Sequence, residues 1–377
     1  MLNPKKIFLV TGAEFNNIVK DEKSYDIVDT TIKKIVFDYW SNGYSDGRNK
    51  VYGSDHWENG SIIDEEKSGE IRLFKSEDGT VAYILSEGKI YANPDSSQMF
   101  RGFTGVSDIV FNNFNTSKVQ FMRRMFSDCS SLTAINLRNF DTSKVQDMRK
   151  IFLGCSGLTS IDVTSFNTSN AKDMSSIFEG CSGLRSIDVS KFNTSRATTM
   201  GGMFYGCSGL TKLDLSNFDT SKVINMAYMF YGCSGLTKLD LSNFNTANVS
   251  DMGSMFQYVS NLKTIDLSSF DTSNVSFMTA MFAQCMKLEE LDISNFNTCE
   301  VTSMANMFYS NYELKTIYVG DSWSTAKVNL SYNMFANSDK IKGSQGTTHN
   351  INHIDKTYAR VDGGASAPGY LTFKSSK

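Results

Sequence analysis

The chain has 377 residues, and its 37 basic and 40 acidic side chains leave a net charge of −3. This balance argues against a nucleic-acid binder, which usually carries a basic excess or stripe. No apolar run approaches the roughly 20 residues of a membrane-spanning helix, so no membrane insertion is expected. With 27 phenylalanines, 18 methionines and only three histidines, the composition favours an apolar core over a histidine-based metal or catalytic site.

Residues 1–98 are predicted to form an N-terminal capping region of strands and a hairpin. Residues 35–40 alternate as a strand does, and residues 70–74 and 81–85 predict a hairpin around the Asp78-Gly79 turn. Residues 41–60 are rich in Gly, Ser and Asp and predict a loop. The first residues lack the apolar stretch of about 7–15 residues of a secretory signal, and the last residues resemble no anchor.

From residue 99 to residue 336 the sequence repeats every 26 residues. Met-Phe or Ile-Phe pairs start at Met99, Met125, Ile151, Ile177, Met203, Met229, Met255, Met281 and Met307, and one more follows at Met334. Each apolar position therefore forms a column, such as the phenylalanines 126, 152, 178 and 204 and the leucines 132, 158, 184 and 210. Repeats of this length indicate a stack of units, none of which can bury its own apolar face.

The unit at residues 203–228 illustrates the expected local structure. Leu213-Asp214-Leu215 alternates with period two, which predicts a short strand with Asp214 facing out. Asp219-Thr220-Ser221 is a turn and helix-start signal. Val223, Met226, Phe230 and Cys233 then recur at spacings of three and four, which predicts a short helix. The fold class is therefore α/β: a leucine-rich-repeat solenoid of about ten coils with a parallel strand on one face, a helix on the other and a C-terminal cap at residues 337–377.

The usual inward Asn or Cys of leucine-rich repeats is replaced by Phe, as at Phe140. The Asp/Asn-Thr-Ser columns are therefore the candidates for the hydrogen bonds that an Asn ladder would make. The unit M-F-x-x-C-S-x-L-x-x-L-D-L-S-x-F-D-T-S-x-V-x-x-M resembles the repeat of BspA-type leucine-rich-repeat surface proteins. Residues 12–21, 30–37 and 83–100 resemble the N-terminal cap of that family, and residues 356–372 resemble its C-terminal cap. The resemblance implies adhesion to host or microbial partners, a cell-surface or secreted location, and no enzyme activity.

Three surface sets are candidate binding sites. An acidic column is expected on the outward strand face, where a solvated ladder is favoured over a stripe for a cationic partner or Ca²⁺; it contains Asp162, Asp188, Asp214, Asp240, Asp266 and Asp292. A basic set is either solvated or a patch for an acidic glycan or acidic protein segment; it contains Arg123, Arg124, Arg149 and Lys150. A set of outward aromatics either contacts a partner or shields neighbouring coils; it contains Tyr205, Tyr228, Tyr231, Phe277 and Tyr309.

No catalytic, cofactor or metal motif is evident. The cysteine column has no C-x-x-C pair and is expected to hold buried, reduced thiols, whereas Cys299 in a turn is expected to be exposed. An enzyme would need chemistry around Asp55, His56 and Glu58, which lie in a loop without a supporting motif. His349 and His353 are expected at a solvated surface.

The leading hypothesis is a non-enzymatic binding or adhesion module that presents a solenoid surface to an extracellular protein or glycan. The alternative is a structural spacer or self-assembly element of a larger surface protein, which the near-identity of the coils favours. The oligomeric state is left open.

Overall fold

The structure is a computed structural model that describes residues 7–20, 29–40, 61–76 and 78–375. The chain divides into two compact units, which are described separately below. The first takes in residues up to Ala171 together with Cys181–Leu184, and the second takes in Lys172–Gly180 and Arg185 onward. Within the described residues the only α-helix is α1, Gly12–Lys20.

A five-stranded sheet dominates the N-terminal part of the first unit. Its order is β3-β4-β5-β2-β7, formed by Ser61–Ile62, Ile71–Lys75, Val81–Ser86, Lys34–Tyr39 and Asp108–Phe111. The predicted strand is confirmed as β2, and the predicted hairpin is confirmed as the antiparallel pair β4 and β5. Strand β7 pairs with β2 in parallel and lies beyond residue 98, so this sheet extends into the sequence of the first repeat. The predicted loop at residues 41–60 lies outside the described residues.

A second, three-stranded parallel sheet has the order β1-β6-β8, from Ile7–Phe8, Ile90–Tyr91 and Phe114–Asn115. Helix α1 follows β1 and buries Phe15 and Val19. The Phe15 ring stacks on Phe37 of β2 with a centroid distance of 5.8 Å. This aromatic contact fixes the helix against the five-stranded sheet.

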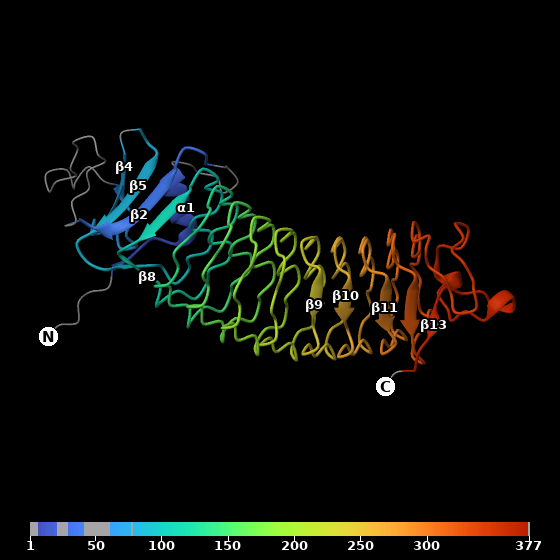
Figure 1. Ribbon diagram of the computed structural model, residues 1–377. Coiled ribbons are helices and arrows are strands. Elements are labelled where there is room, and N and C mark those ends of the chain that lie inside the picture. Colours follow the sequence, from blue (N-terminus) through green and yellow to red (C-terminus); the bar gives the residue numbers. More distant parts are fainter. Residues whose placement is uncertain (1–6, 21–28, 41–60, 77, 376–377) are drawn as a thin grey trace. The chain divides into compact units, whose positions relative to one another are not determined.

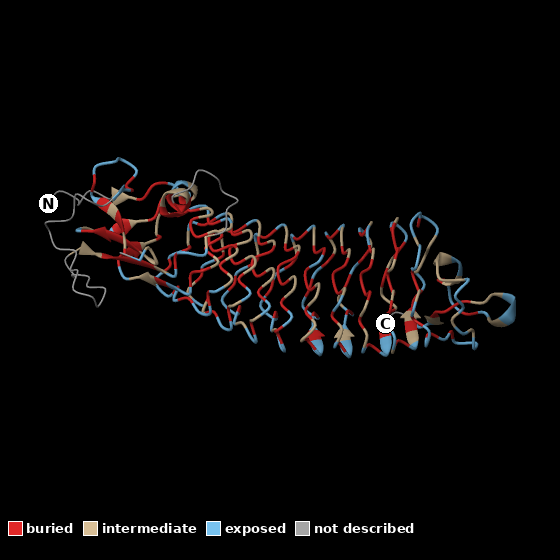
Figure 2. Ribbon diagram, turned by 90° about the horizontal axis from the view of Figure 1, so that it is seen from above, coloured by how far each residue is buried: buried red, intermediate tan, exposed pale blue. Residues whose placement is uncertain are grey.

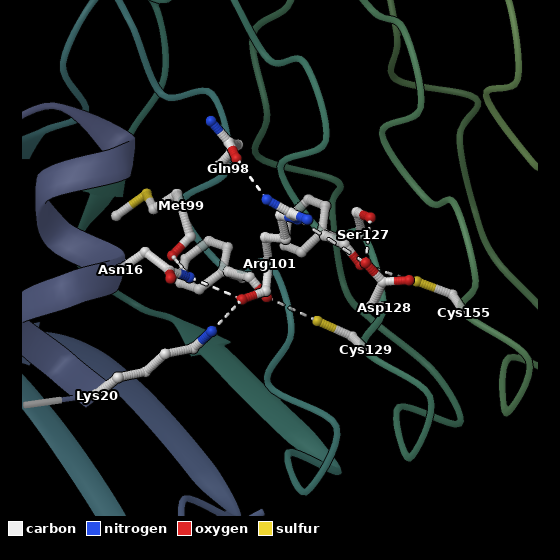
Figure 3. A network of polar contacts seen from close by, with 11 residues as sticks. Asn16, Lys20, Gln98, Met99, Arg101, Ser127, Asp128, Cys129 and Cys155 are labelled. Atoms are coloured by element: carbon white, nitrogen blue, oxygen red, sulfur yellow. Dashed lines mark hydrogen bonds and ion pairs between the residues drawn. The ribbon is translucent and has the colours of Figure 1, made fainter. Parts of the chain in front are cut away.

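Helix α1 also covers the backbone of the first coil (Figure 3). The Asn16 side-chain amide donates to the carbonyls of Met99 and Arg101 at 3.2 and 2.9 Å, and the Lys20 ammonium donates to the same Arg101 carbonyl at 2.7 Å. Lys20 is buried, with its ammonium 5.0 Å from the centre of the Phe103 ring. An end coil has no preceding coil to pair with, so these side chains supply its missing donors.

The predicted strands form in only part of the coil stack. In the second unit, β9 (Lys238–Asp240) pairs with β10 (Thr264–Asp266), and β11 (Glu290–Ile293) pairs with β12 (Thr316–Val319), all in parallel. The register is 26 residues, and Figure 1 shows these strands in successive coils. In earlier coils the same segment forms no strand and makes at most one inter-coil backbone bond, as from the Thr211 amide to the Arg185 carbonyl at 3.3 Å. One such bond is too little for a ladder, so the expectation of a strand in every coil is wrong.

The predicted helix on the other face of each coil is also wrong. That segment is a run of turns in which backbone N–H groups alternate between two kinds of acceptor. Met226, Tyr228, Phe230 and Gly232 donate to Asp251, Gly253, Met255 and Gln257 of the next coil, whereas Met229, Tyr231 and Cys233 donate three residues back, to Met226, Tyr228 and Phe230. The chain thus forms a second inter-coil ladder where the spacing predicted a helix.

Two left-handed residues per coil explain why no helix forms. Tyr228 and Gly232 have φ values of 61° and 69°, and the equivalent pair one coil later, Ser254 and Tyr258, has 53° and 62°. A residue at positive φ cannot lie inside a right-handed helix. Side chains at spacings of three and four still reach the core, because the turns close every three residues.

The predicted apolar columns are buried, and Figure 2 shows buried and exposed residues alternating along the coils. The phenylalanine rings stack almost face to face from coil to coil, for example Phe204 on Phe230 with centroids 6.0 Å apart and planes at 3°. The cysteine column is confirmed as buried free thiols, and Cys299 is exposed. Each buried thiol also hydrogen-bonds a carbonyl 29 residues earlier, as from Cys233 Sγ to Phe204 O at 3.0 Å.

The predicted replacement for an Asn ladder is confirmed. Buried threonines link consecutive coils through their hydroxyls; in the second unit these are Thr194, Thr220, Thr246, Thr272 and Thr298, bonded to Asp219, Asn245, Asp271, Asn297 and Ser324. The preceding carboxylate or amide holds the same turn, as when Asp219 accepts from the Ser221 amide at 3.0 Å. The columns therefore satisfy backbone groups that the coils bury.

The C-terminal residues close the second unit. Strand β13, Thr372–Phe373, pairs in parallel with β12, and two 3₁₀ turns lie at Lys356–Tyr358 and Gly364–Ser366. The buried carboxylate of Asp362 accepts hydrogen bonds from the amides of Gln345, Thr347 and Gly364 and from the Thr347 hydroxyl. It thereby joins two loops of the cap.

Candidate functional site

The acidic column lies on the exposed strand face. Asp240 and Asp266 are register partners on β9 and β10. Each carboxylate accepts the amide two residues ahead, from Thr164, Ser190, Ser216, Ser242, Ser268 and Ser294 in chain order. These bonds fit the interpretation favoured from the sequence, a hydrogen-bonded ladder.

Ion pairs occupy positions near both ends of this column. In the first unit Arg138 lies 3.1 Å from Asp162, and in the second unit Lys374 lies 2.5 Å from Asp292. Hydrogen bonds from Ser216 hold the pKa of Asp214 below its ordinary value, although its neighbours Asp188 and Asp240 act in the opposite direction. Among the described residues no group of three or more His, Cys, Asp or Glu side chains could hold a metal ion.

The basic set is less concentrated than the sequence suggested. Arg149 forms a two-point ion pair with Asp147, at 2.9 Å from Nε and 2.6 Å from a terminal nitrogen. Arg124 and Lys150 have left-handed backbones, with φ values of 55° and 58°, and are partly buried. Arg123 is exposed. Part of the charge is therefore neutralised locally.

The outward aromatics form the most distinctive surface, which we call the tyrosine cluster and which contains Tyr205, Tyr228, Tyr231 and Tyr258. Tyr205 stacks on Tyr231 with centroids 4.3 Å apart and planes at 4°. Tyr228 lies 6.0 Å from Tyr231, and Tyr258 meets Tyr231 edge-on at 5.2 Å. Tyr228 is 48% exposed and Tyr258 is 37% exposed, so the cluster presents aromatic surface to solvent.

The Tyr231 hydroxyl is neutral over the whole physiological range. Burial and the neighbouring Tyr205 raise the pKa of Tyr231 to about 12. The cluster offers π faces and hydroxyl groups to a partner. Stacked tyrosines are rigid, so little conformational entropy is lost when a partner packs on them.

A hollow of about 440 Å³ opens beside the cluster, which we call the glycine hollow. Its lining comes from four successive coils and consists of Ser175, Ser176, Glu179, Thr199, Gly201, Gly202, Tyr205, Asn225, Ala227, Tyr228 and Asp251. Two of the cluster's rings thus form part of its wall. The lining holds two carboxylates and no basic side chain.

The structure brings together only some of the predicted aromatics. Among the described residues, the ring contacts join Tyr205, Tyr228 and Tyr231 but include neither Phe277 nor Tyr309. Phe277 is half exposed and Tyr309 is partly buried. Tyr258 was missed, although the sequence offered a signal: it replaces the glycine found at the equivalent position, Gly232.

The other sequence candidates supply no site. Asp55, His56 and Glu58 lie outside the described residues. The His349 side chain is only 8% exposed, which corrects the prediction of a solvated position. Its Nδ1 lies 3.1 Å from Asp339 and its Nε2 lies 3.1 Å from the Phe335 carbonyl. His353 stacks on Tyr358 with centroids 4.2 Å apart.

Coils with one register, small parallel sheets and very little helix define this chain as a repeat protein. A family model described as "Mycoplasma protein of unknown function, DUF285" matches residues 94–208, 158–261 and 237–350. The three matches overlap and together cover more than half of the chain, so the chain belongs to this family. The family description names no activity.

The other comparisons add little to this assignment. No curated protein matches the chain. A crystal structure of a TLR13–ssRNA13 complex is 11% identical over 64% of this chain and has a TM-score of 0.18, which is too low to carry an argument. The chain covers 50% of that protein's length. No helix in the described part of the chain has both the length and the apolar character required for a membrane crossing.

Proposed function

We propose that this protein is a leucine-rich-repeat solenoid of the BspA type and acts as a non-enzymatic binding or adhesion module for an extracellular protein or glycan. The observation that carries the proposal is the tyrosine cluster. Tyr228 and Tyr258 are exposed on a regular scaffold. Most equivalent positions in other coils hold non-aromatic residues, such as Glu179, Gly202 and Ala280. The coils therefore do not need aromatic side chains there, whereas interfaces favour them.

Local chemistry also supports a binding role. The acidic column is occupied by turn hydrogen bonds, and part of the basic set is paired. The tyrosine cluster with its adjoining hollow combines apolar surface, hydroxyl groups and carboxylates in one place. Exposed aromatic side chains of this kind are enriched at interfaces with macromolecular partners.

The test is direct binding of the whole chain to a panel of extracellular-matrix proteins and acidic glycans. Saturable binding to one member is expected, and the double variant Tyr205→Ala/Tyr228→Ala should weaken it at least about tenfold, as for an aromatic anchor. Tyr312→Ala is the matched control, because Tyr312 is 49% exposed and lies outside the cluster. Binding that survives the double variant would contradict the role of the cluster.

A spacer or self-assembly role remains the second candidate. The coils from 151 to 252 are nearly uniform, and Phe373 on β13, which pairs with β12, is 49% exposed. Sedimentation over a range of protein concentrations tests self-assembly. A species that stays monomeric would count against it.

A further inference from the structure

Two consecutive glycines line the glycine hollow. Gly201 and Gly202 occupy a slot that holds at least one side chain in every other coil, such as Ser175-Ser176 before it and Ala227-Tyr228 after it. A Cβ added at Gly201 would lie 2.9 Å from Asn225 Oδ1, and one added at Gly202 would lie 3.1 Å from Ser176 Oγ. A side chain at either position would therefore press on Asn225 or Ser176, which line the same hollow.

The electrostatics of the hollow favour a cation. The Glu179 side chain makes no hydrogen bond or ion pair within the described part of the chain, so its carboxylate is available to a ligand. Asp251 uses Oδ1 to accept the Gly253 amide at 2.9 Å, which leaves its second oxygen. Because no lysine or arginine lines the hollow, nothing there offsets these two negative charges.

The aromatic wall selects among cations. Tyr205 and Tyr228 line the hollow together with the two carboxylates. A guanidinium group stacks on aromatic faces, is weakly hydrated and bonds carboxylates through two parallel N–H groups. An ammonium or a bare metal ion would gain less from the rings, and an anionic group would be repelled.

We propose that the glycine hollow receives one arginine side chain of a protein partner, with Glu179 as its ion-pair acceptor and Tyr205 and Tyr228 beside the guanidinium. This inference rests on the proposed binding function and specifies the group recognised at the tyrosine cluster. The stacked pair Tyr205 and Tyr231 would then serve as the rigid apolar surround that excludes water from the contact.

The first experiment uses N-acetyl-arginine amide as the probe and follows the tyrosine ring signals of the whole chain by NMR. Saturable shifts are expected at Tyr205 and Tyr228. Glu179→Gln should lower the affinity for the probe about fivefold, which is the contribution of one partly exposed ion pair. Gly201→Ser should lower the affinity by at least as much, because the new side chain would occupy part of the hollow. Serine is already found at the equivalent position of another coil, Ser175.

Matched controls separate these effects from loss of folding. Gly88→Ser makes the same change in the first unit, where an added Cβ meets only an ordinary contact, 3.6 Å from Ile7. Glu290→Gln removes an exposed carboxylate on the strand face, and both residues lie outside the lining. These two variants should bind the probe as the parent does. Unfolding midpoints measured for all four variants show which of them are fully folded.

Several outcomes would overturn the inference. They are an absence of saturable shifts, equal binding by the parent and the Glu179→Gln variant, or tighter binding of a neutral hexose or of N-acetyl-glutamate amide. Failure of the proposed function is distinguishable. If the tyrosine variants abolish partner binding while Glu179→Gln leaves it unchanged, the arginine pocket is wrong and the binding module stands.

Discussion

The hydroxyl of Thr220 donates to the Asn245 carbonyl and accepts from the Asn245 amide, both at 2.8 Å. One buried side chain therefore satisfies both backbone groups of a residue in the next coil. The same pair of bonds recurs at Thr194, Thr272 and Thr298.

Replacing this hydroxyl should show how much it contributes to the free energy of unfolding. Thr220→Val keeps the shape but leaves two partly buried backbone groups without a partner, and it should lower the free energy of unfolding by about 2 kcal/mol. Thr220→Ser keeps the hydroxyl and should cost only about 1 kcal/mol for the lost methyl group. Urea unfolding of both variants measures the difference. Equal losses would show that the hydroxyl contributes little.

The thiols should differ sharply in reactivity. Burial raises the pKa of Cys155, Cys233 and Cys285 to about 12, so the reactive thiolate is scarce in the folded protein. A thiol reagent at mildly alkaline pH should modify the exposed Cys299 and reach the six buried cysteines only after denaturation. Cys299→Ser should abolish the native reaction. Rapid modification of several cysteines in the folded state would contradict the buried column.

Replacing or introducing glycine at the positions with a left-handed backbone should change the free energy of unfolding in a predictable direction. Gly206 and Gln284 occupy the same slot, with φ values of 68° and 60°. Gly206→Ala should lower the free energy of unfolding by about 1 kcal/mol, although the added Cβ meets only ordinary contacts at 3.7 Å. Gln284→Gly should raise it by a smaller amount, because glycine's unfolded-state entropy offsets part of the gain. Shifts of the opposite sign in the unfolding midpoint would rule out backbone strain as the cause.

The C-terminal cap should weaken in acid through Asp362. Burial acts to raise the pKa of this carboxyl, but hydrogen bonds from Thr347, Gly364 and Gln345 outweigh it and lower the pKa to about 2. The stabilisation is complete above the ordinary value of 3.8 and is lost as pH falls toward about 2. Asp362→Asn should therefore be less stable at neutral pH and should approach the parent as pH falls.

Thermal unfolding at a series of pH values measures this convergence. Asp321→Asn, at an exposed position, is the control and should run parallel to the parent. A constant gap between Asp362→Asn and the parent across the acid range would show that the carboxylate's charge is not the source of its contribution.

Much of the fold was predictable, because a 26-residue period fixes which side chains meet. Phe204 and Phe230 must stack if the coils do, and Thr220 must face the next coil. The helix prediction failed because spacings of three and four fit both a helix and a run of turns that close every three residues. Glycine at 206 and 232 was a signal against a helix, yet Tyr228 and Tyr258 adopt the same left-handed backbone without being glycine.

The candidate site was predictable only in part. Tyr205, Tyr228 and Tyr231 stood out because they interrupt the repeat, and Gly201-Gly202 interrupts it too. Most of these residues border one hollow together with Glu179 and Asp251. They do so because particular positions of four successive coils lie side by side, and the backbone path through the turns decides which positions those are.

The sequence alone determined the period, the apolar columns, the threonine links and the membership of the core, because burial and hydrogen bonding act identically on every copy of a repeated unit. Tertiary structure alone decided the turns in place of helices, the uneven formation of strands and the position of the glycine hollow. These features depend on whether each backbone N–H group donates to an acceptor in its own coil or to one in the next coil. The two hydrogen bonds are nearly equal in energy, so the local sequence does not decide between them.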